Sequence, residues 1–99
     1  MPKCFKDLEF EFLGGATEHL SLRGTVIVRD HEMVLDIHCP DFAPYLIHGK
    51  STGVFYSGRH EGVQDVRVDA KWTCLDDIYI GTWVEYGMDF VFKFRLEEE

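Results

Sequence analysis

The sequence lacks the features that place a protein in or across a membrane. No apolar run reaches the roughly 20 residues that a transmembrane helix needs. The first residues, Met1-Pro2-Lys3-Cys4-Phe5, do not form the charged and then apolar pattern of a secretory signal. We therefore expect a cytoplasmic protein with no membrane partner.

Basic residues are scarce. The 99 residues include 10 Lys and Arg against 18 Asp and Glu, which gives a net charge of −8. Affinity for phosphate backbones depends on clustered Lys and Arg, and the sequence has no basic stripe. We therefore expect no nucleic-acid partner, and the acidic excess is typical of a charge that serves solubility.

Motifs for metal binding and covalent catalysis are also missing. The three cysteines, Cys4, Cys39 and Cys74, are widely spaced and form no C-x-x-C pair. The 5 histidines include no H-x-H or H-x-x-x-H pair, which is how zinc ligands usually occur. No G-x-S-x-G nucleophile motif is present. The sequence therefore predicts neither a metal site nor a cofactor.

Helical periodicity is absent, because apolar residues at i, i+3, i+4 and i+7 are not sustained over ten residues anywhere. What the sequence has instead is alternation of apolar and polar residues. This alternation predicts seven or eight strands at residues 5–13, 18–29, 32–38, 45–48, 54–60, 63–74, 78–86 and 88–96. Short strands at this regular spacing are typical of an all-β sandwich or barrel.

Short turns favour pairing between strands that are neighbours in the chain, so we predict an antiparallel up-and-down meander. Closing the meander into a barrel would remove the edge strands that otherwise recruit other chains. A chain of 99 residues forms one domain, 1–99, with room for one small ligand at most. A half-open barrel completed by a dimer partner is the alternative to a closed one.

The last quarter of the chain has the clearest pattern. One face of the strand at 88–96 is a wall of large apolar residues that faces a core: Met88, Phe90, Phe92, Phe94 and Leu96. The preceding strand is apolar on both faces, so the sequence does not decide whether Tyr79 and Trp83 or Ile80 and Val84 point inward.

This last quarter also carries a resemblance. The pattern I-Y-x-x-x-W-x-E-x-G, formed by Ile78, Tyr79, Trp83, Glu85 and Gly87, resembles the Y-x-x-x-W-x-E segment of certain calycin-like barrels. Those barrels are related to phenolic acid decarboxylase and to the molybdenum cofactor biosynthesis protein F family. The run 81–83 is similar to the G-x-W signature of lipocalins and avidins, although it lies near the C-terminus here and near the N-terminus there. The resemblance implies a small antiparallel barrel with a pocket for an apolar or aromatic molecule.

Aromatic side chains are concentrated in the later strands, where they would either pack solidly or line a hole. Our first hypothesis is a non-catalytic barrel that binds a small apolar or aromatic molecule in an aromatic-lined pocket. The candidate ligand-binding residues are Tyr56, Trp72, Tyr79, Trp83, Glu85 and Phe92.

Two charged residues suggest a second hypothesis, an enzyme of the calycin type acting on an aromatic or unsaturated carboxylic acid. Glu85 would be the general acid or base, and Arg59 would hold the substrate carboxylate inside the barrel. The alternation does not decide which face of the strand at 54–60 is inward. A third hypothesis is a homodimeric structural or interaction protein, in which the doubly apolar strand at 78–86 meets its symmetry mate.

Overall fold

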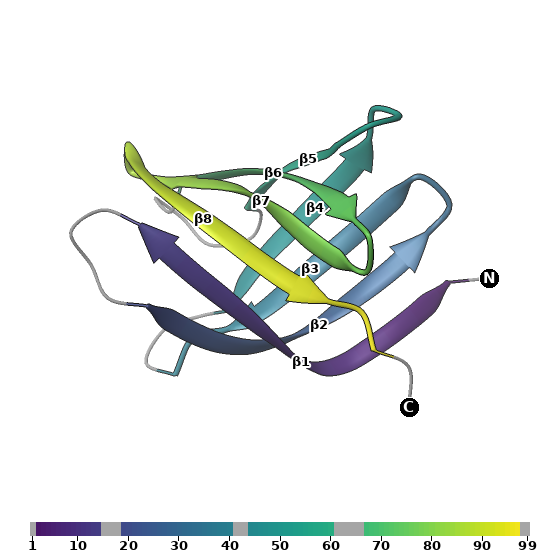
Figure 1. Ribbon diagram of the computed structural model, residues 1–99, viewed down its shortest axis with the longest axis horizontal. Helices are drawn as coiled ribbons and strands as arrows, with labels where there is room; N and C mark the ends of the chain where they lie inside the picture. The colour runs from purple at the N-terminus through teal and green to yellow at the C-terminus, as the bar shows by residue number, and fades with distance from the viewer. Residues whose placement is uncertain (1, 15–18, 41–43, 61–66, 98–99) are drawn as a thin grey trace.

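A computed structural model describes residues 2–14, 19–40, 44–60 and 67–97. Eight antiparallel strands follow one another around a closed barrel, and β1 pairs with β8 to complete the ring (Figure 1). The strands are β1 (Lys3–Gly14), β2 (Leu20–Arg29), β3 (Glu32–His38), β4 (Tyr45–Ser51), β5 (Tyr56–His60), β6 (Val68–Leu75), β7 (Ile78–Glu85) and β8 (Met88–Arg95). The all-β, up-and-down prediction is confirmed, and of the two predicted forms the closed barrel is found.

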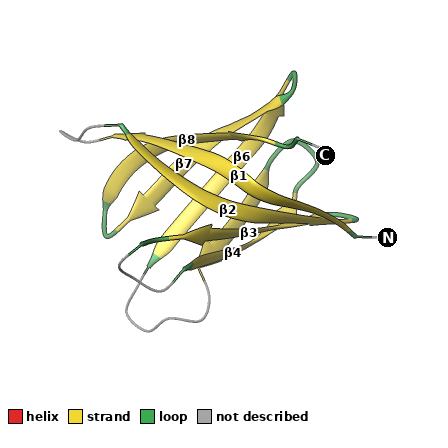
Figure 2. Cartoon of the chain, turned by 90° about the horizontal axis from the view of Figure 1, so that it is seen from below, coloured by secondary structure: helices red, strands yellow, loops and turns green. Residues whose placement is uncertain are grey.

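The described chain is strand, turn and loop throughout (Figure 2). None of it forms a helix of the length and apolarity required to cross a membrane. β4 is longer than the predicted 45–48, and β5 is shorter than the predicted 54–60. Residue 18 and residues 63–66 of two predicted strands lie outside the described part of the chain.

The turn between β7 and β8 fixes the register of the C-terminal hairpin. Glu85 pairs with Met88, so only Tyr86 and Gly87 connect the strands. Both have left-handed backbone angles, with φ of 52° and 79°. A two-residue turn of this kind matches the right-handed twist of the flanking strands. The hairpin therefore brings Trp83 opposite Phe90, and both side chains reach the same end of the barrel.

A β-bulge bends β1 close to its middle. Phe5 pairs with Val26 and Leu8 pairs with Gly24, so β1 uses one more residue than β2 over this interval. Asp7, within the bulge, has a φ of 57°. Gly24 lies in the middle of β2, and a glycine in a strand interior often marks a bulge. The extra residue, however, belongs to β1, the strand that pairs with β2. Gly24 itself serves close packing, since a Cβ there would collide with the backbone oxygen of Asp36 on β3 and come within 2.9 Å of the Phe10 ring.

The barrel interior is solid over most of its length. Fifteen buried apolar side chains form one cluster: Phe5, Leu8, Phe10, Phe12, Val26, Met33, Leu35, Ile37, Ile47, Val68, Ala70, Trp72, Trp83, Phe92 and Phe94. Phe92 and Phe94 are 0% and 2% exposed, so this part of the predicted wall does face the core, whereas Met88, beside the turn, is 55% exposed. β7 points Tyr79, Trp83 and Glu85 inward, which answers the question that its two apolar faces left open.

Candidate functional site

One end of the barrel holds a cavity of about 340 Å³ above the solid core. Its walls come from β1, β2, β4, β7, β8 and the chain that follows β3. The lining residues are Phe12, Leu20, Leu22, Cys39, Pro40, Tyr45, Trp83, Glu85, Met88 and Phe90. Apart from the Cys39 thiol and the Glu85 carboxylate, the other eight of these ten side chains are aliphatic or aromatic. The cavity therefore suits an apolar ligand.

The floor of the cavity is aromatic. Phe12 meets the edge of Trp83 at 5.1 Å between ring centroids. Phe92 packs beneath both rings, at 5.8 Å from Phe12 and 5.6 Å from Trp83. Because these rings come from inward positions of β1, β7 and β8, strand alternation alone places them together. They separate the cavity from the solid core below.

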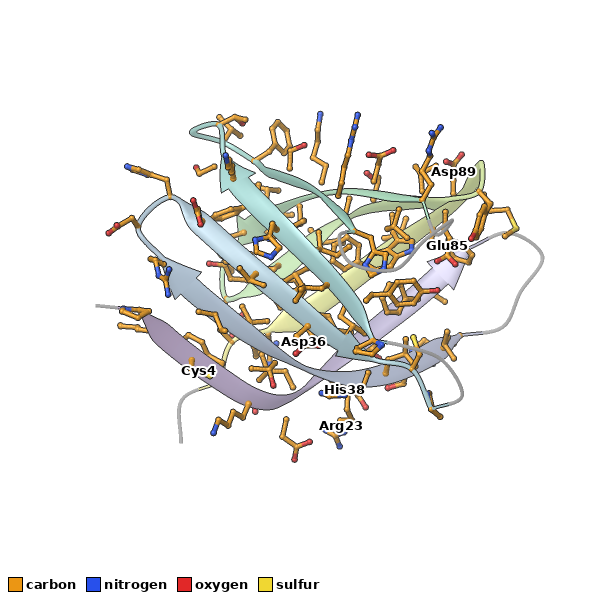
Figure 3. All side chains as sticks on the ribbon, turned by 180° about the vertical axis from the view of Figure 1, so that it is seen from behind. Cys4, Arg23, Asp36, His38, Glu85 and Asp89 are labelled. Atoms are coloured by element: carbon orange, nitrogen blue, oxygen red, sulfur yellow. The ribbon has the colours of Figure 1, made fainter. Side chains whose placement is uncertain are left out.

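Glu85 is the one carboxylate that the described residues contribute to the cavity wall, and it is half-buried. The Tyr45 hydroxyl donates a 2.8 Å hydrogen bond to Oε2 of Glu85. The Trp83 indole Nε1–H donates a 3.0 Å hydrogen bond to Oε1. Each oxygen thus has one donor among the described residues, and the two bonds hold the carboxylate in one orientation. Figure 3 shows Glu85 at one end of the barrel, with Cys4 at the opposite end.

Tyr45 is positioned by rings on two sides. Its ring lies 5.3 Å from that of Trp83, at an interplanar angle of 88°. His60 packs edge-on against it at 5.4 Å. His60 Nδ1 accepts a 2.9 Å hydrogen bond from the backbone N–H of Leu46, which fixes the imidazole in turn. The Tyr45 hydroxyl therefore reaches Glu85 from a rigid support.

The cavity holds Tyr45 and Cys39 in their neutral forms. Burial is the main cause that raises the pKa of Tyr45, and the hydrogen bond to Glu85 and its negative charge add to it. Burial also raises the pKa of Cys39, again with a contribution from the Glu85 charge. A thiol of this kind is a weak nucleophile, since the thiolate is the reactive form. Tyr45 therefore acts as a hydrogen-bond donor and Cys39 as a small apolar wall residue.

The structure places only two of the predicted site residues at this cavity, Trp83 and Glu85. Phe92 lies beneath the floor and is fully buried. Tyr56 stacks on Trp72 at 5.8 Å, and Trp72 is 0% exposed. These three residues, like Tyr79, fill the barrel and do not line the hole. The barrel interior is thus solidly packed over most of its length and hollow at the end that holds the cavity.

Tyr79 lies towards the other end of β7 and stacks on Phe94, with ring centroids 5.2 Å apart. Its pKa is raised, first by burial and then by the nearby Cys74 and Tyr56. It shares the inward face of β7 with Trp83, as the alternation implies, but it is a core residue.

Arg59 is on the outside of the barrel. Its side chain is 84% exposed and forms a 2.9 Å ion pair with Asp69 on β6. The inward face of β5 therefore excludes Arg59, and the hypothesis that Arg59 holds a substrate carboxylate inside the barrel loses its basis. No Lys or Arg lines the cavity within the described residues.

Sequence reasoning missed Tyr45, the second donor to Glu85. It follows Pro44 at the start of a short strand, and its pairing with Ile37 puts it on the inward face of β4. Strand alternation could have placed Tyr45 on the inward face. Its contact with Glu85 could not be predicted in this way, because the two residues are 40 positions apart in the chain. Cys39 and Pro40, which follow the end of the predicted strand at 32–38, also form part of the wall.

A larger hollow, of about 390 Å³, lies where β1 and β8 diverge, and charged side chains dominate it. Lys93 pairs with Glu11 at 3.5 Å, and Arg23 donates to the backbone oxygen of Asp7 at 3.1 Å. Within the described residues no three His, Cys, Asp or Glu side chains are grouped to hold a metal ion. The apolar cavity with its oriented carboxylate is therefore the candidate site.

In comparisons with known proteins, no family model, curated protein or solved structure matches the chain. The eight-stranded closed barrel and its aromatic cluster are compatible with a calycin-like barrel. Support for that resemblance comes from the architecture alone.

Proposed function

We propose that this protein is a non-catalytic barrel that binds a small apolar or aromatic molecule in the cavity floored by Phe12 and Trp83. The observation that carries the proposal is an apolar cavity of about 340 Å³ in whose described wall one carboxylate, Glu85, is held by two donors. Small-molecule sites combine a mainly apolar wall with a few fixed polar groups, and their volumes begin near 300 Å³.

The chemistry of the lining favours binding over catalysis. The raised pKa values of Cys39 and Tyr45 keep both groups protonated at neutral pH, so neither is an activated nucleophile. The enzyme hypothesis for a carboxylic acid also requires a cation beside the substrate, and Arg59 lies outside the barrel.

Native mass spectrometry of the protein as purified from cells tests the proposal. We expect a mass excess that disappears after denaturation. Leu22 lines the cavity, so the Leu22→Trp variant should fill it and lose the excess. Leu75 is 60% exposed beside the turn at the other end of β7, so Leu75→Trp is the matched control and should keep the excess.

A second measurement tests for binding when the natural ligand is lost during purification. Titration with 2-phenylethanol, a neutral aromatic probe, should shift the NMR signal of the Trp83 indole N–H and leave that of Trp72 in place. Trp72 donates to Met33 Sδ within the core, away from the cavity. A mass without excess, together with an unmoved Trp83 signal at millimolar probe, would overturn the proposed function.

A further inference from the structure

Glu85 has hydrogen-bonding capacity that the protein does not use. An ionised carboxylate offers about four lone-pair positions. Tyr45 occupies one on Oε2 and Trp83 occupies one on Oε1, at 2.8 and 3.0 Å. Among the described residues no further donor to Glu85 is seen, so each oxygen has an acceptor position left there, and Glu85 itself belongs to the cavity wall. A guest in the cavity can reach those positions as a donor.

No cationic side chain neutralises this carboxylate. Within the described residues neither Lys nor Arg lines the cavity, and the ion pairs seen there do not include Glu85. The segments outside the description, residues 1, 15–18, 41–43, 61–66 and 98–99, contain no Lys, Arg or His in sequence. The imidazole of His60 packs on Tyr45, is not among the lining residues, and accepts a backbone hydrogen bond. The described part of the chain therefore supplies no counter-charge to the negative charge in the wall.

The Tyr45 hydroxyl and the Trp83 indole N–H are neutral donors, so they compensate only part of the desolvation cost of the Glu85 charge. A carboxylate that faces an apolar hole costs desolvation energy unless a donor or a cation approaches it. Charge-assisted hydrogen bonds are roughly twice as strong as neutral ones, so a cationic donor gains most from this position. An anionic guest would meet repulsion from Glu85 and find no basic partner.

The charge of the whole chain acts in the same direction. A net charge of −8 on 99 residues creates a negative field around the barrel. The field raises the local concentration of small cations and lowers that of anions. It is independent of the Glu85 geometry, and salt screens it over a distance of about 10 Å at 0.1 M.

We infer that the ligand of this cavity is a small amine: a protonated nitrogen that donates to Glu85, carried on an apolar or aromatic body that packs on Phe12, Leu22 and Phe90. The inference rests on the proposed function and adds the chemical class of the ligand. It also separates this site from one for aromatic carboxylic acids.

Three probes that share a phenylethyl body test the inference in the unmodified protein. They are 2-phenylethylamine, which is a cation, 2-phenylethanol, which is neutral, and 3-phenylpropionate, which is an anion. Each is titrated at physiological and at high salt, with the Trp83 indole N–H as the reporter and that of Trp72 as the internal reference. A charged hydrogen bond is worth about 1.5–3 kcal/mol, so the amine should bind at least about tenfold more tightly than the alcohol. The acid should bind most weakly.

Two variants assign the preference to Glu85. Glu85→Gln should reduce the preference for the amine to within about threefold of the alcohol, since it removes the charge and keeps the shape. Asp89→Asn removes the same charge from an exposed position at the same end of the barrel and should keep the preference (Figure 3). The comparison of probes in the unmodified protein stands even if Glu85→Gln fails to fold.

The outcomes are distinguishable. If the alcohol or the acid binds as tightly as the amine, the ligand class is wrong and the binding function stands. If the preference for the amine survives in Glu85→Gln, or disappears at high salt, it comes from the overall field and the role of Glu85 is wrong. If none of the probes moves the Trp83 signal, the inferred ligand class is wrong, and together with a native mass without excess this result also overturns the proposed function.

Discussion

The Tyr45 hydroxyl and Glu85 Oε2 lie 2.8 Å apart, although 40 residues separate them in the chain. This hydrogen bond joins β4 to β7 across the open end of the barrel. β4 and β7 do not pair with each other in the sheet, so the bond is a contact through the interior. It fixes the shape of the cavity mouth and the direction of the carboxylate together.

Removing this bond should destabilise the protein. Tyr45→Phe leaves Glu85 with one donor, and we expect the free energy of unfolding to fall by about 1–2 kcal/mol. Urea denaturation measures the change. Tyr56→Phe is the control, because no hydrogen bond of the Tyr56 hydroxyl is seen within the described residues and its ring also packs against a tryptophan, Trp72. Equal losses in the two variants would contradict a specific role for the bond.

Alkaline pH should weaken the fold through the same residue. The ordinary tyrosine pKa is 10.0, and burial followed by the Glu85 interaction raises that of Tyr45. The folded state therefore keeps a proton that the unfolded chain loses, so the stabilising contribution is complete below pH 10 and is lost as pH rises above it. Tyr79 shifts in the same direction.

Unfolding free energies measured between pH 9 and pH 11.5 test this dependence. Tyr45→Phe should show a shallower decline than the unmodified protein, because one of the two shifted tyrosines is gone. Tyr79→Phe should reduce the slope as well. An unchanged slope in Tyr45→Phe would show that its hydroxyl is not shielded in the fold.

Gly49 makes room for the largest buried side chain. A Cβ at this position would collide with the six-membered ring of Trp72. Gly49→Ala should therefore cost about 1–3 kcal/mol through overpacking. In the background Trp72→Phe, which lacks the colliding ring atoms, the same substitution should cost much less. A double-mutant cycle with no coupling between the two positions would refute the steric explanation.

Cys39 should react slowly with alkylating agents. Burial and the Glu85 charge raise the pKa of its thiol, whereas Cys4 is exposed. At pH 8, mass spectrometry of the iodoacetamide-treated protein should show Cys4 modified several-fold faster than Cys39. In urea the two rates should converge. Faster labelling of Cys39 in the folded protein would show that the cavity activates the thiol.

The predicted homodimer has a specific candidate interface on the outside of the barrel. Leu13 and Val91 form a cross-strand pair on the outside of β1 and β8, and they are 52% and 46% exposed. Thr82 of β7 pairs with Val91 and continues this patch next to the outer face of the doubly apolar strand. We expect analytical ultracentrifugation to show a dimer at micromolar concentration and Val91→Lys to give a monomer. Leu75→Lys is the control, and a monomeric unmodified protein would refute the prediction.

The sequence predicts the fold well because strand alternation reports burial directly. Phe92 and Phe94 were assigned to the core from period-two spacing, and both are buried. Alternation fails where both faces of a strand are apolar, as in β7. There the decision comes from a partner on another strand, since Tyr45 and Phe12 are what hold Trp83 and Glu85 inside.

The candidate site was predicted less completely, for a related reason. Aromatic density points to Trp83 correctly but also to Trp72 and Tyr79, because ring content alone cannot separate packed rings from those that line a hole. Arg59 was ambiguous until pairing of β5 with β6 set it beside Asp69. Contacts between distant segments decided every case that local patterning left open.

The seam between β1 and β8 has a consequence for how the barrel forms. All other pairings join strands that follow one another in the chain, whereas this one joins the first strand to the last through four residue pairs, as many as join β5 to β6. Loop-closure entropy is greatest for such a contact, and few hydrogen bonds offset it. The seven hairpins can form from local contacts, so closure should be the last step of folding and the first to be lost when the barrel opens. The start of β1 and the end of β8 also lie at the same end of the molecule (Figure 1). A circular permutant that joins them would turn the longest-range pairing of the barrel into a local hairpin.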